Sequence, residues 1–360
     1  MYEIHISDVR NFLQCRQRWS WASPIRTNLE SKTPNRHLWL GSAVHYALGA
    51  YYGADRSARS LLHAYEEWCT KQMAAIDGQV ELTDELREEL VEARELGKGM
   101  LSNYVLWART HDDFDVVMPE VQFSHPMGEY NGKEIVFAGT CDGLVKTPDG
   151  KHWLLEHKTT AQFETDRKQG FKYLFHDQQC LAYLWATRQD PRFSEWGMLP
   201  EGVIYTFLRK EVPKPPKLLK SGELSRAKNQ KTTYELFRWA MKKYNAPEHA
   251  YTEILETLKA QPDKYVARAN IHMGGQKRLD MFEEHLRAIV HDMFYGEIYP
   301  NPGMLGFNCK WCPFFGPCNL SQNGVDPRGV LAADFRKRTR SPFDLPDFIQ
   351  PGSSSVPDSE

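Results

Sequence analysis

The sequence predicts an α/β fold in which helices flank a central sheet, and two features of the pattern indicate it. Residues 38–52, 57–110 and 275–295 carry apolar side chains at helical spacing with few helix breakers. Between residues 115 and 159 the pattern changes to short β-favouring runs divided by Gly, Pro and Asp. Both kinds of segment need a partner surface, so we expect them to pack together around one core.

The expected elements follow from these patterns in chain order. Ser7 is a suitable N-cap for the first helix. The expected helices cover residues 8–21, 38–52, two or three segments within 57–110, 175–187, 234–244, 251–260 and 275–295. The expected strands are short apolar runs at residues 116–118, 121–123, 135–137, 144–145, 153–155 and 203–208. The last twenty residues are rich in Ser, Pro and Asp, which predicts disorder there.

Charge and cysteine content exclude several classes of protein. The chain has 360 residues, with 45 Lys and Arg against 47 Asp and Glu, so its surface is not uniformly basic. It has an odd number of cysteines, seven, and no secretory leader is visible in its first residues. No apolar run is long enough to span a bilayer. We therefore expect a cytoplasmic protein, with no membrane partner, whose cysteines are thiols or metal ligands.

A predicted hairpin brings two carboxylates together. Pro148-Asp149-Gly150 is a turn signal between two strand-like runs. If the turn centres on Asp149, the numbers of facing residues sum to 298, and Asp142 lies opposite Glu156. Facing Cβ atoms lie about 4.5–5.5 Å apart, close enough for two carboxylates to share one divalent cation.

Lys158 is two residues beyond Glu156 and therefore shares its strand face. Carboxylates suit Mg²⁺ or Mn²⁺, and such a cation can activate water for attack on a phosphodiester. A lysine beside them could stabilise charge on the reacting phosphate. The alternative is a surface hairpin with an exposed Glu–Lys pair that contributes little energy.

The order of these residues resembles the core of the PD-(D/E)xK nuclease superfamily. Gly139-x-x-Asp142-Gly143, followed by Glu156-His-Lys158, is similar to that family's Asp…Glu-x-Lys motif. Leu40-Gly41-Ser42-Ala43-Val44-His45 resembles the metal-binding helix of the RecB-like branch, and Gln179-x-x-x-Tyr183 resembles its later helical motif. Gln178 is an adjacent alternative to Gln179, and His45 by itself could equally be a packed core histidine.

The resemblance implies a restriction-endonuclease-like core with a mixed sheet, and it implies roles for individual residues. His45, Asp142 and Glu156 would hold Mg²⁺ or Mn²⁺, helped by the main-chain carbonyl of His157. Lys158 would be the catalytic lysine, and Gln179 and Tyr183 would orient Lys158 or the DNA. Glu120 resembles an acidic strand position of some relatives and ranks as support only.

Three late cysteines have the spacing of a metal or cluster site. Cys309-x2-Cys312-x5-Cys318 lacks a fourth ligand nearby, and Cys15 is the distant candidate. The arrangement resembles AddB-type nucleases and the iron–sulfur nucleases of CRISPR adaptation. That resemblance implies a [4Fe–4S] cluster closing a long loop between the two ends of the chain. Zinc is the alternative occupant, followed by cysteines without any ligand.

These motifs together predict a metal-dependent DNA exonuclease of recombination, repair or phage DNA metabolism. Two alternatives are a DNA-end-binding subunit without catalysis and a redox protein that uses the cluster. A basic stretch at 209–231, with Arg16 and Arg18, is expected to contact phosphates. The chain has no phosphate-binding loop of a helicase, so unwinding would need a helicase or recombination partner.

We expect one nuclease domain over residues 1–320 that contains a helical insertion at about 55–112 and draws cluster ligands from both of its ends. Residues 321–360 are expected to form a largely disordered tail.

Overall fold

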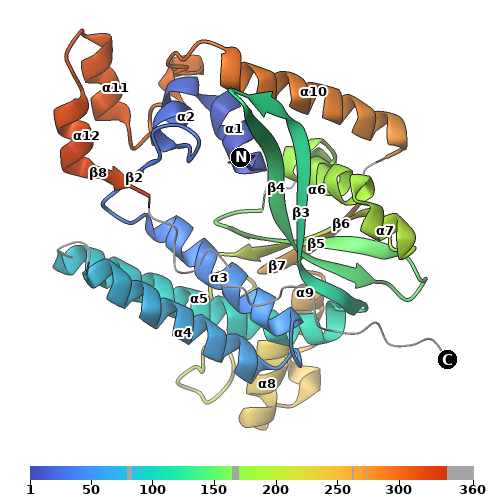
Figure 1. Ribbon diagram of the computed structural model, residues 1–360. Coiled ribbons are helices and arrows are strands. Elements are labelled where there is room, and N and C mark those ends of the chain that lie inside the picture. Colours follow the sequence, from blue (N-terminus) through green and yellow to red (C-terminus); the bar gives the residue numbers. More distant parts are fainter. Residues whose placement is uncertain (79–82, 164–169, 262, 273, 339–360) are drawn as a thin grey trace. The chain divides into compact units, whose positions relative to one another are not determined.

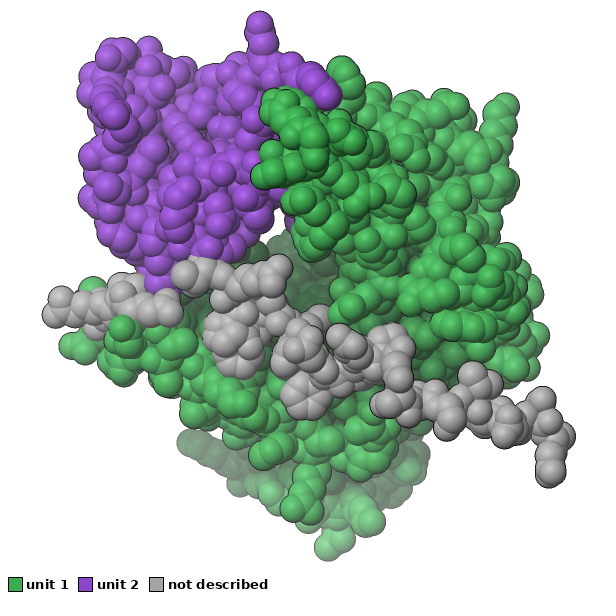
Figure 2. All heavy atoms as spheres, viewed as in Figure 1, with its two compact units in different colours: residues 1–6, 34–294 green, residues 7–33, 295–360 purple. Residues whose placement is uncertain are grey.

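The chain divides into two compact units, each of which is described separately below (Figure 2). A computed structural model describes residues 1–78, 83–163, 170–261, 263–272 and 274–338. Unit 1 consists of residues 1–6 and 34–294, and unit 2 of residues 7–33 and 295 onward. Unit 2 is therefore built from both ends of the chain.

A mixed sheet forms the centre of unit 1, as the sequence predicts. Its strand order is β1-β4-β5-β6-β7, and β3 pairs with the other edge of β4. The β1–β4 and β5–β6 pairs are parallel, whereas the other pairs are antiparallel. The strands are β1 (Tyr2–Ile4), β3 (Asp115–Tyr130), β4 (Lys133–Lys146), β5 (His152–Thr160), β6 (Pro200–Arg209) and β7 (Val266–His272).

Two of these strands, β1 and β7, are not predicted from the sequence. Both are short, and β7 carries Arg268 and Asn270 within an apolar run, which hides the strand pattern. Conversely, the five short runs predicted between 116 and 155 belong to only three strands. Two of those strands are long because β3 and β4 stay paired through two register shifts.

Helices cover the sheet of unit 1. Three of them, α3, α4 and α5, lie side by side, and α3 also packs on β3, β4 and β5 (Figure 1). The helix α6 packs against β3, β4 and β6. The principal helices of this unit are α3 (Arg36–Tyr52), α4 (Ala58–Asp77), α5 (Asp84–His111), α6 (Gln178–Gln189), α7 (Pro191–Glu195), α8 (Tyr234–Lys243), α9 (Thr252–Lys259) and α10 (Gln276–Tyr295).

The start of α3 shows how local sequence sets an element that carries the site. Asn35 accepts hydrogen bonds from the backbone N–H groups of His37 and Leu38, which caps the helix two residues before the predicted start. Val44, Ala47 and Leu48 are buried on its inner face. His45 follows Val44 on this helix, which packs against the sheet, and its side chain is 38% exposed.

Unit 2 has a small aromatic core of its own. Trp21, Leu29, Phe314 and Phe335 are buried together, and the rings of Phe314 and Phe335 stack at 4.4 Å. Its elements are α1 (Ile6–Gln14), α2 (Arg16–Ala22), β2 (Leu29–Ser31), α11 (Phe315–Gln322), α12 (Arg328–Asp334) and β8 (Phe335–Lys337). The strands β2 and β8 pair antiparallel.

Two predictions about this unit need correction. The single helix expected over 8–21 is two helices, because Cys15 adopts an extended conformation (φ −163°, ψ 112°) between them. Disorder was expected from residue 321 onward, but residues 321–338 are ordered. Phe335 completes the aromatic core, and β8 pairs with β2. The remainder of the expected tail, 339–360, lies outside the described residues.

Candidate active site and thiol pocket

The hairpin β4–β5 has the register that the sequence predicts. Gly150 has a left-handed φ of 83°, and Thr147 N–H donates to the carbonyl of Lys151 at 2.9 Å. The facing pairs run from Lys146 with His152 to Gly143 with Leu155. Each pair sums to 298, so the next position along the hairpin places Asp142 opposite Glu156.

Asp142 is held by two histidines from different elements. Its Oδ2 accepts hydrogen bonds from the backbone N–H of His157 at 2.7 Å and lies 2.9 Å from His157 Nδ1. Its Oδ1 lies 3.2 Å from Nδ1 of His45 on α3. Burial alone would raise the pKa of Asp142, but the charge of His45 and these hydrogen bonds hold it below its usual range. Asp142 is therefore an ionised, oriented carboxylate.

Glu156 is buried and only half satisfied. Gln179 on α6 donates from Nε2 to its Oε1 at 2.6 Å. The other oxygen, Oε2, is buried without a hydrogen-bond partner among the described residues. Burial and the nearby charge of Asp142 raise the pKa of Glu156 well above its usual range. A buried carboxylate oxygen without a donor has the chemistry of an oxygen ligand for a hard cation.

The Gln179–Tyr183 pair of α6 and Lys158 of β5 lie beside this carboxylate. Gln179 Nε2 also donates to the Tyr183 hydroxyl at 3.2 Å, so Gln179, rather than the adjacent Gln178, is the residue that reaches Glu156. The charge of Lys158 acts on Glu156 and opposes the rise in its pKa. Within the described ranges Lys158 has no ion-pair partner. Its ammonium group is thus not neutralised by a neighbouring carboxylate of that part of the chain.

Glu120 adds a third carboxylate to the same row. The flanking pairs Pro119 with Gly143 and Val121 with Cys141 place Glu120 opposite Asp142 across β3 and β4. Its backbone has a left-handed φ of 49°. Burial, followed by the charge of Asp142, raises the pKa of Glu120 to about 8. Three adjacent strands therefore align Glu120, Asp142 and Glu156.

A glycine of α3 makes room for this third carboxylate. A Cβ atom at Gly49 would lie 2.6 Å from Glu120 Oε1, too close for any other residue without a shift. This tight contact is with β3, because Glu120 turns toward the helix.

The carboxylate site has the oxygen donors that Mg²⁺ or Mn²⁺ prefers. In this structure its side chains form hydrogen bonds with one another. Within the described residues, no group of three or more His, Cys, Asp and Glu side chains has the arrangement of a metal site. The hydrogen bonds among His45, Asp142 and His157 account for that closed arrangement. The orphaned Oε2 of Glu156 and the ionised Asp142 fit a divalent cation.

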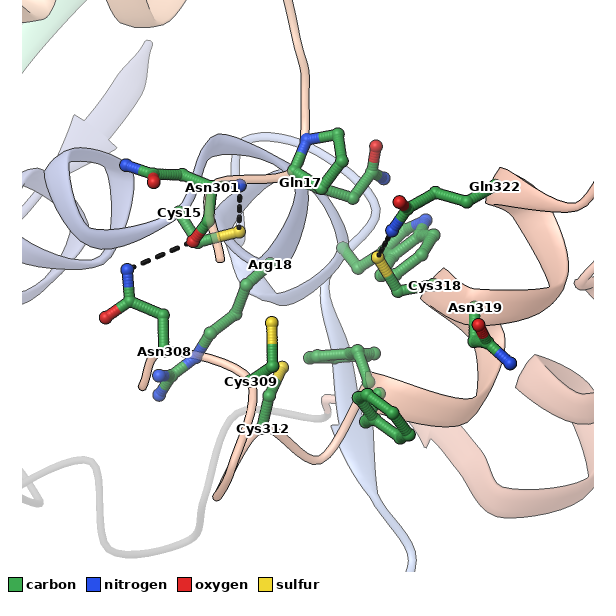
Figure 3. Close-up of a pocket in the computed structure, with 14 residues that line it drawn as sticks. Cys15, Gln17, Arg18, Asn301, Asn308, Cys309, Cys312, Cys318, Asn319 and Gln322 are labelled. Atoms are coloured by element: carbon green, nitrogen blue, oxygen red, sulfur yellow. Dashed lines mark hydrogen bonds between the residues drawn. The ribbon is translucent and has the colours of Figure 1, made fainter. Parts of the chain in front are cut away.

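The four cysteines singled out by spacing line one pocket of unit 2. Cys15 comes from the break between α1 and α2, Cys309 and Cys312 come from the segment before α11, and Cys318 lies within α11. Their side chains lie around this pocket (Figure 3), which has a volume of about 60 Å³. All four are free thiols of intermediate exposure. As at the carboxylate site, the described thiols do not have the arrangement of a metal site.

Few hydrogen bonds hold these sulfurs in place. Asn301 N–H donates to Cys15 Sγ and Gln322 Nε2 donates to Cys318 Sγ, both at 3.3 Å (Figure 3). Burial raises the pKa of the Cys312 thiol. Soft sulfur donors suit iron or zinc, so the donor set fits either occupant proposed from the sequence.

The basic stretch begins next to the active-site strand. Lys210 N–H donates to the carbonyl of Thr160, the last residue of β5, at 2.7 Å. Lys214, Lys217 and Lys220 are exposed, and none of them forms an ion pair with another described residue. Arg16, by contrast, packs its guanidinium over the rings of Phe12 and Tyr299 and donates to the carbonyl of Glu297.

Comparison with known proteins identifies the family. The family model described as the PD-(D/E)XK nuclease superfamily matches residues 4–319, nearly the whole chain. A crystal structure of a protein designated SSO0001 is similar at 13% identity, with 87% of this chain and 83% of that chain covered. Its TM-score of 0.33 is too low to support a conclusion. No curated protein matches the chain. Among the described helices, none combines the length and apolar character that a membrane span requires.

Proposed function

Because the chain belongs to the PD-(D/E)XK nuclease superfamily, we propose that it is a Mg²⁺- or Mn²⁺-dependent deoxyribonuclease that degrades DNA from ends or in single strands. The observation that carries the proposal is the convergence of His45, Asp142 and Glu156, with one Glu156 oxygen left without a donor. These side chains, with the carbonyl of His157, would hold the cation. The cation would supply positive charge at the phosphate and activate water.

The chain's own residues have distinct parts in this proposal. Lys158, which has no ion-pair partner in the described ranges, would stabilise negative charge on the reacting phosphate. Gln179 orients Glu156 through its 2.6 Å hydrogen bond, and Tyr183 supports Gln179. These contacts support a role for this pair in positioning the carboxylate, whereas the family resemblance implies that the pair orients Lys158 or the DNA.

The decisive assay measures degradation of end-labelled single- and double-stranded DNA with Mg²⁺ or Mn²⁺. We expect Lys158→Ala to lower the cleavage rate by about 10³-fold, the size expected for removing a charge-stabilising group. Lys151→Ala, at the exposed β4–β5 turn, is the matched control and should keep the wild-type rate. If the wild type shows no metal-dependent cleavage, the result would contradict the proposed enzyme and favour a DNA-end-binding subunit.

Circular DNA distinguishes an exonuclease from an endonuclease. An enzyme that needs ends should degrade a linear single strand and leave the circular form of the same sequence intact. Nicking of the circle at a comparable rate would contradict the exonuclease assignment.

Substrate contact by the basic loop is a separate part of the proposal. Lys214, Lys217 and Lys220 are exposed on the loop that follows β6, and the loop begins beside the end of β5. Reversing these three charges should reduce the slope of log K against log salt by about 0.9 for each lost phosphate contact. Reversal of Lys133, Lys146 and Lys151, exposed on the β3–β4 and β4–β5 hairpins, is the control. An unchanged slope would remove the loop from the binding site.

We further propose that Cys15, Cys309, Cys312 and Cys318 hold a [4Fe–4S] cluster, with zinc as the alternative. The support is that cysteines from both ends of the chain line one pocket. Anaerobic purification with metal analysis tests it, since a cluster gives a brown protein with broad visible absorbance and about four iron atoms per chain. Stoichiometric zinc without colour would decide for the alternative. A partner such as a helicase or recombination protein would supply the nuclease with DNA ends or single strands.

A further inference from the structure

A line of buried polar groups extends from β7 to the proposed metal ligand Asp142. At its far end, Arg268 Nη2 lies 2.8 Å from Asp112 Oδ1, and their side chains are 13% and 4% exposed. Arg268 also donates to the carbonyl of His111 at 2.8 Å and to Thr206 Oγ1 at 3.0 Å. A buried arginine held by three partners fixes the Asp112 carboxyl group in place.

Two phenols continue the line from Asp112. The Tyr52 hydroxyl donates to Asp112 Oδ2 at 2.9 Å and shares a short hydrogen bond with the Tyr104 hydroxyl. The Tyr104 hydroxyl in turn lies 3.2 Å from Nε2 of His157. Tyr52 is 4% exposed and Tyr104 is fully buried. Burial raises the pKa of both phenols, so both stay protonated hydrogen-bond donors.

The His157 ring joins the line to Asp142. Each phenol has a single hydrogen, and Tyr52 donates its hydrogen to Asp112. The Tyr104 hydroxyl lies between the Tyr52 hydroxyl and Nε2 of His157. On the other side of the ring, Nδ1 lies 2.9 Å from Oδ2 of Asp142, which also accepts a hydrogen bond from the His157 backbone N–H. The Arg268–Asp112 pair is therefore connected to Asp142 through an unbroken series of hydrogen-bonding groups.

We propose that Arg268, Asp112, Tyr52 and Tyr104 are positioning residues that act through His157 to hold Asp142 Oδ2, leaving Oδ1 directed toward His45 and the cation. The inference rests on the proposed metal site. A carboxylate anchored through one oxygen loses less freedom when the other oxygen takes up a ligand, and such supporting contacts commonly tune metal affinity.

Removing single hydroxyl groups tests this inference with little change in packing. Tyr104→Phe and Tyr52→Phe keep the aromatic ring and delete one link each. Tyr65→Phe is the matched control, because Tyr65 is equally buried and donates to the carbonyl of Arg94 at 3.0 Å, outside the line. The measurements are the Mn²⁺ dissociation constant of the metal-free protein, by calorimetry or electron paramagnetic resonance, and the midpoint of thermal unfolding.

We expect Tyr104→Phe to weaken Mn²⁺ binding about tenfold, the lower end of the range for residues that support metal ligands. Tyr52→Phe should have a smaller effect in the same direction, and Tyr65→Phe should leave Mn²⁺ affinity unchanged while lowering thermal stability. The double variant should bind Mn²⁺ about as weakly as Tyr104→Phe alone, because both changes break one chain.

Wild-type Mn²⁺ affinity in Tyr104→Phe, with a loss of stability like that of Tyr65→Phe, would overturn the inference. Independent, additive effects of the two phenols on affinity would overturn it as well. A wild-type protein that binds Mn²⁺ but cleaves no DNA would overturn the proposed nuclease, and the Mn²⁺ affinities would still decide the positioning role.

Discussion

The carboxylate site of unit 1 and the thiol pocket of unit 2 differ in how far the protein itself arranges the donor atoms. At the carboxylate site, both oxygens of Asp142 and one of Glu156 have hydrogen-bond partners. In the thiol pocket, Cys15 Sγ and Cys318 Sγ each accept a hydrogen bond at 3.3 Å, but sulfur is a weak acceptor and all four cysteines are partly exposed. Hydrogen bonds prearrange the first site, whereas the second would depend on the proposed metal or cluster to order its sulfurs.

This difference has a physical origin in the donors. A carboxylate oxygen accepts strong hydrogen bonds, so neighbouring histidine and glutamine side chains can orient it before a cation arrives. A thiol sulfur is a weak acceptor, and only a bound metal or cluster can tie four of them together. We therefore expect substitutions at the first site to impair chemistry and those at the second to impair stability.

The largest expected effect is at Glu156. Glu156→Gln keeps the shape of the side chain but removes the charge that would hold the cation, so cleavage should fall by about 10³-fold. Because burial raises the pKa of Glu156, the neutral variant should be at least as stable as the wild type at pH 7. The measurements are single-turnover cleavage and thermal unfolding. A variant that loses activity by unfolding would contradict the idea of a prearranged site.

At the thiol pocket, we expect a substitution to impair stability rather than cleavage. Cys312→Ala should abolish the bound iron or zinc and lower the free energy of unfolding by about 2 kcal/mol or more, because the occupant's binding energy contributes to folding. Metal analysis and denaturant unfolding measure both effects. Cys69→Ala is the control, since Cys69 is a buried cysteine on α4 that does not line the pocket, and this variant should retain the full metal content. Full metal content in Cys312→Ala would exclude a four-cysteine site.

The pH dependence of Mn²⁺ binding would sharpen the description of the first site. Burial disfavours the charged form of His45, but the charge of Asp142 prevails and raises the pKa of His45 to about 9. Since only neutral histidine can ligate a metal, binding releases a proton below that pH. Mn²⁺ affinity should rise by up to about tenfold per pH unit between pH 7 and 9. Calorimetry in two buffers of different ionisation enthalpy would detect the proton, and its absence would argue against His45 as a ligand.

The smallest expected effect is at Glu120 in the metal-free protein. Its raised pKa means that the folded chain keeps a proton that the unfolded chain loses, so its contribution to stability falls as pH rises from about 4.5 to about 8. Glu120→Gln should remove that slope. At pH 8 it should raise the unfolding midpoint by about 2–4 °C, the shift that 1 kcal/mol produces in a large domain. An unchanged slope would show that Glu120 ionises normally.

Local sequence patterns were enough to predict most helices and strands and the position of Asp142 opposite Glu156. The Pro148-Asp149-Gly150 turn determines the β4–β5 register, and that register places Asp142 opposite Glu156. The helices 234–244, 251–260 and 275–295 agree with α8, α9 and α10 to within one residue at each end. Short-range geometry of this kind depends on neighbours in the chain, so the sequence alone contains it.

Other features depended on contacts between distant segments and could not be predicted in this way. The extended residue Cys15 interrupts an otherwise helical pattern, and β1 and β7 are strands only because longer strands pair with them. Glu120 was recognised as an acidic strand position but not as a neighbour of Asp142, because a register shift between Pro126 and Gly128 intervenes between the β3–β4 turn and Glu120. No pattern in the sequence connects Tyr52, Tyr104, Asp112 and Arg268.

The sequence by itself determined the family, the α/β class and the identity of the chemical groups, because these depend on residue types at short spacing. Only the tertiary structure decided which of those groups are oriented and which are left unsatisfied. The orientation of these groups depends on the pairing of β3, β4 and β5. It also depends on buried hydrogen bonds, some of which join residues more than a hundred positions apart. Burial in a low-dielectric interior then determines which carboxylates are charged and which oxygen of Glu156 is left for a cation.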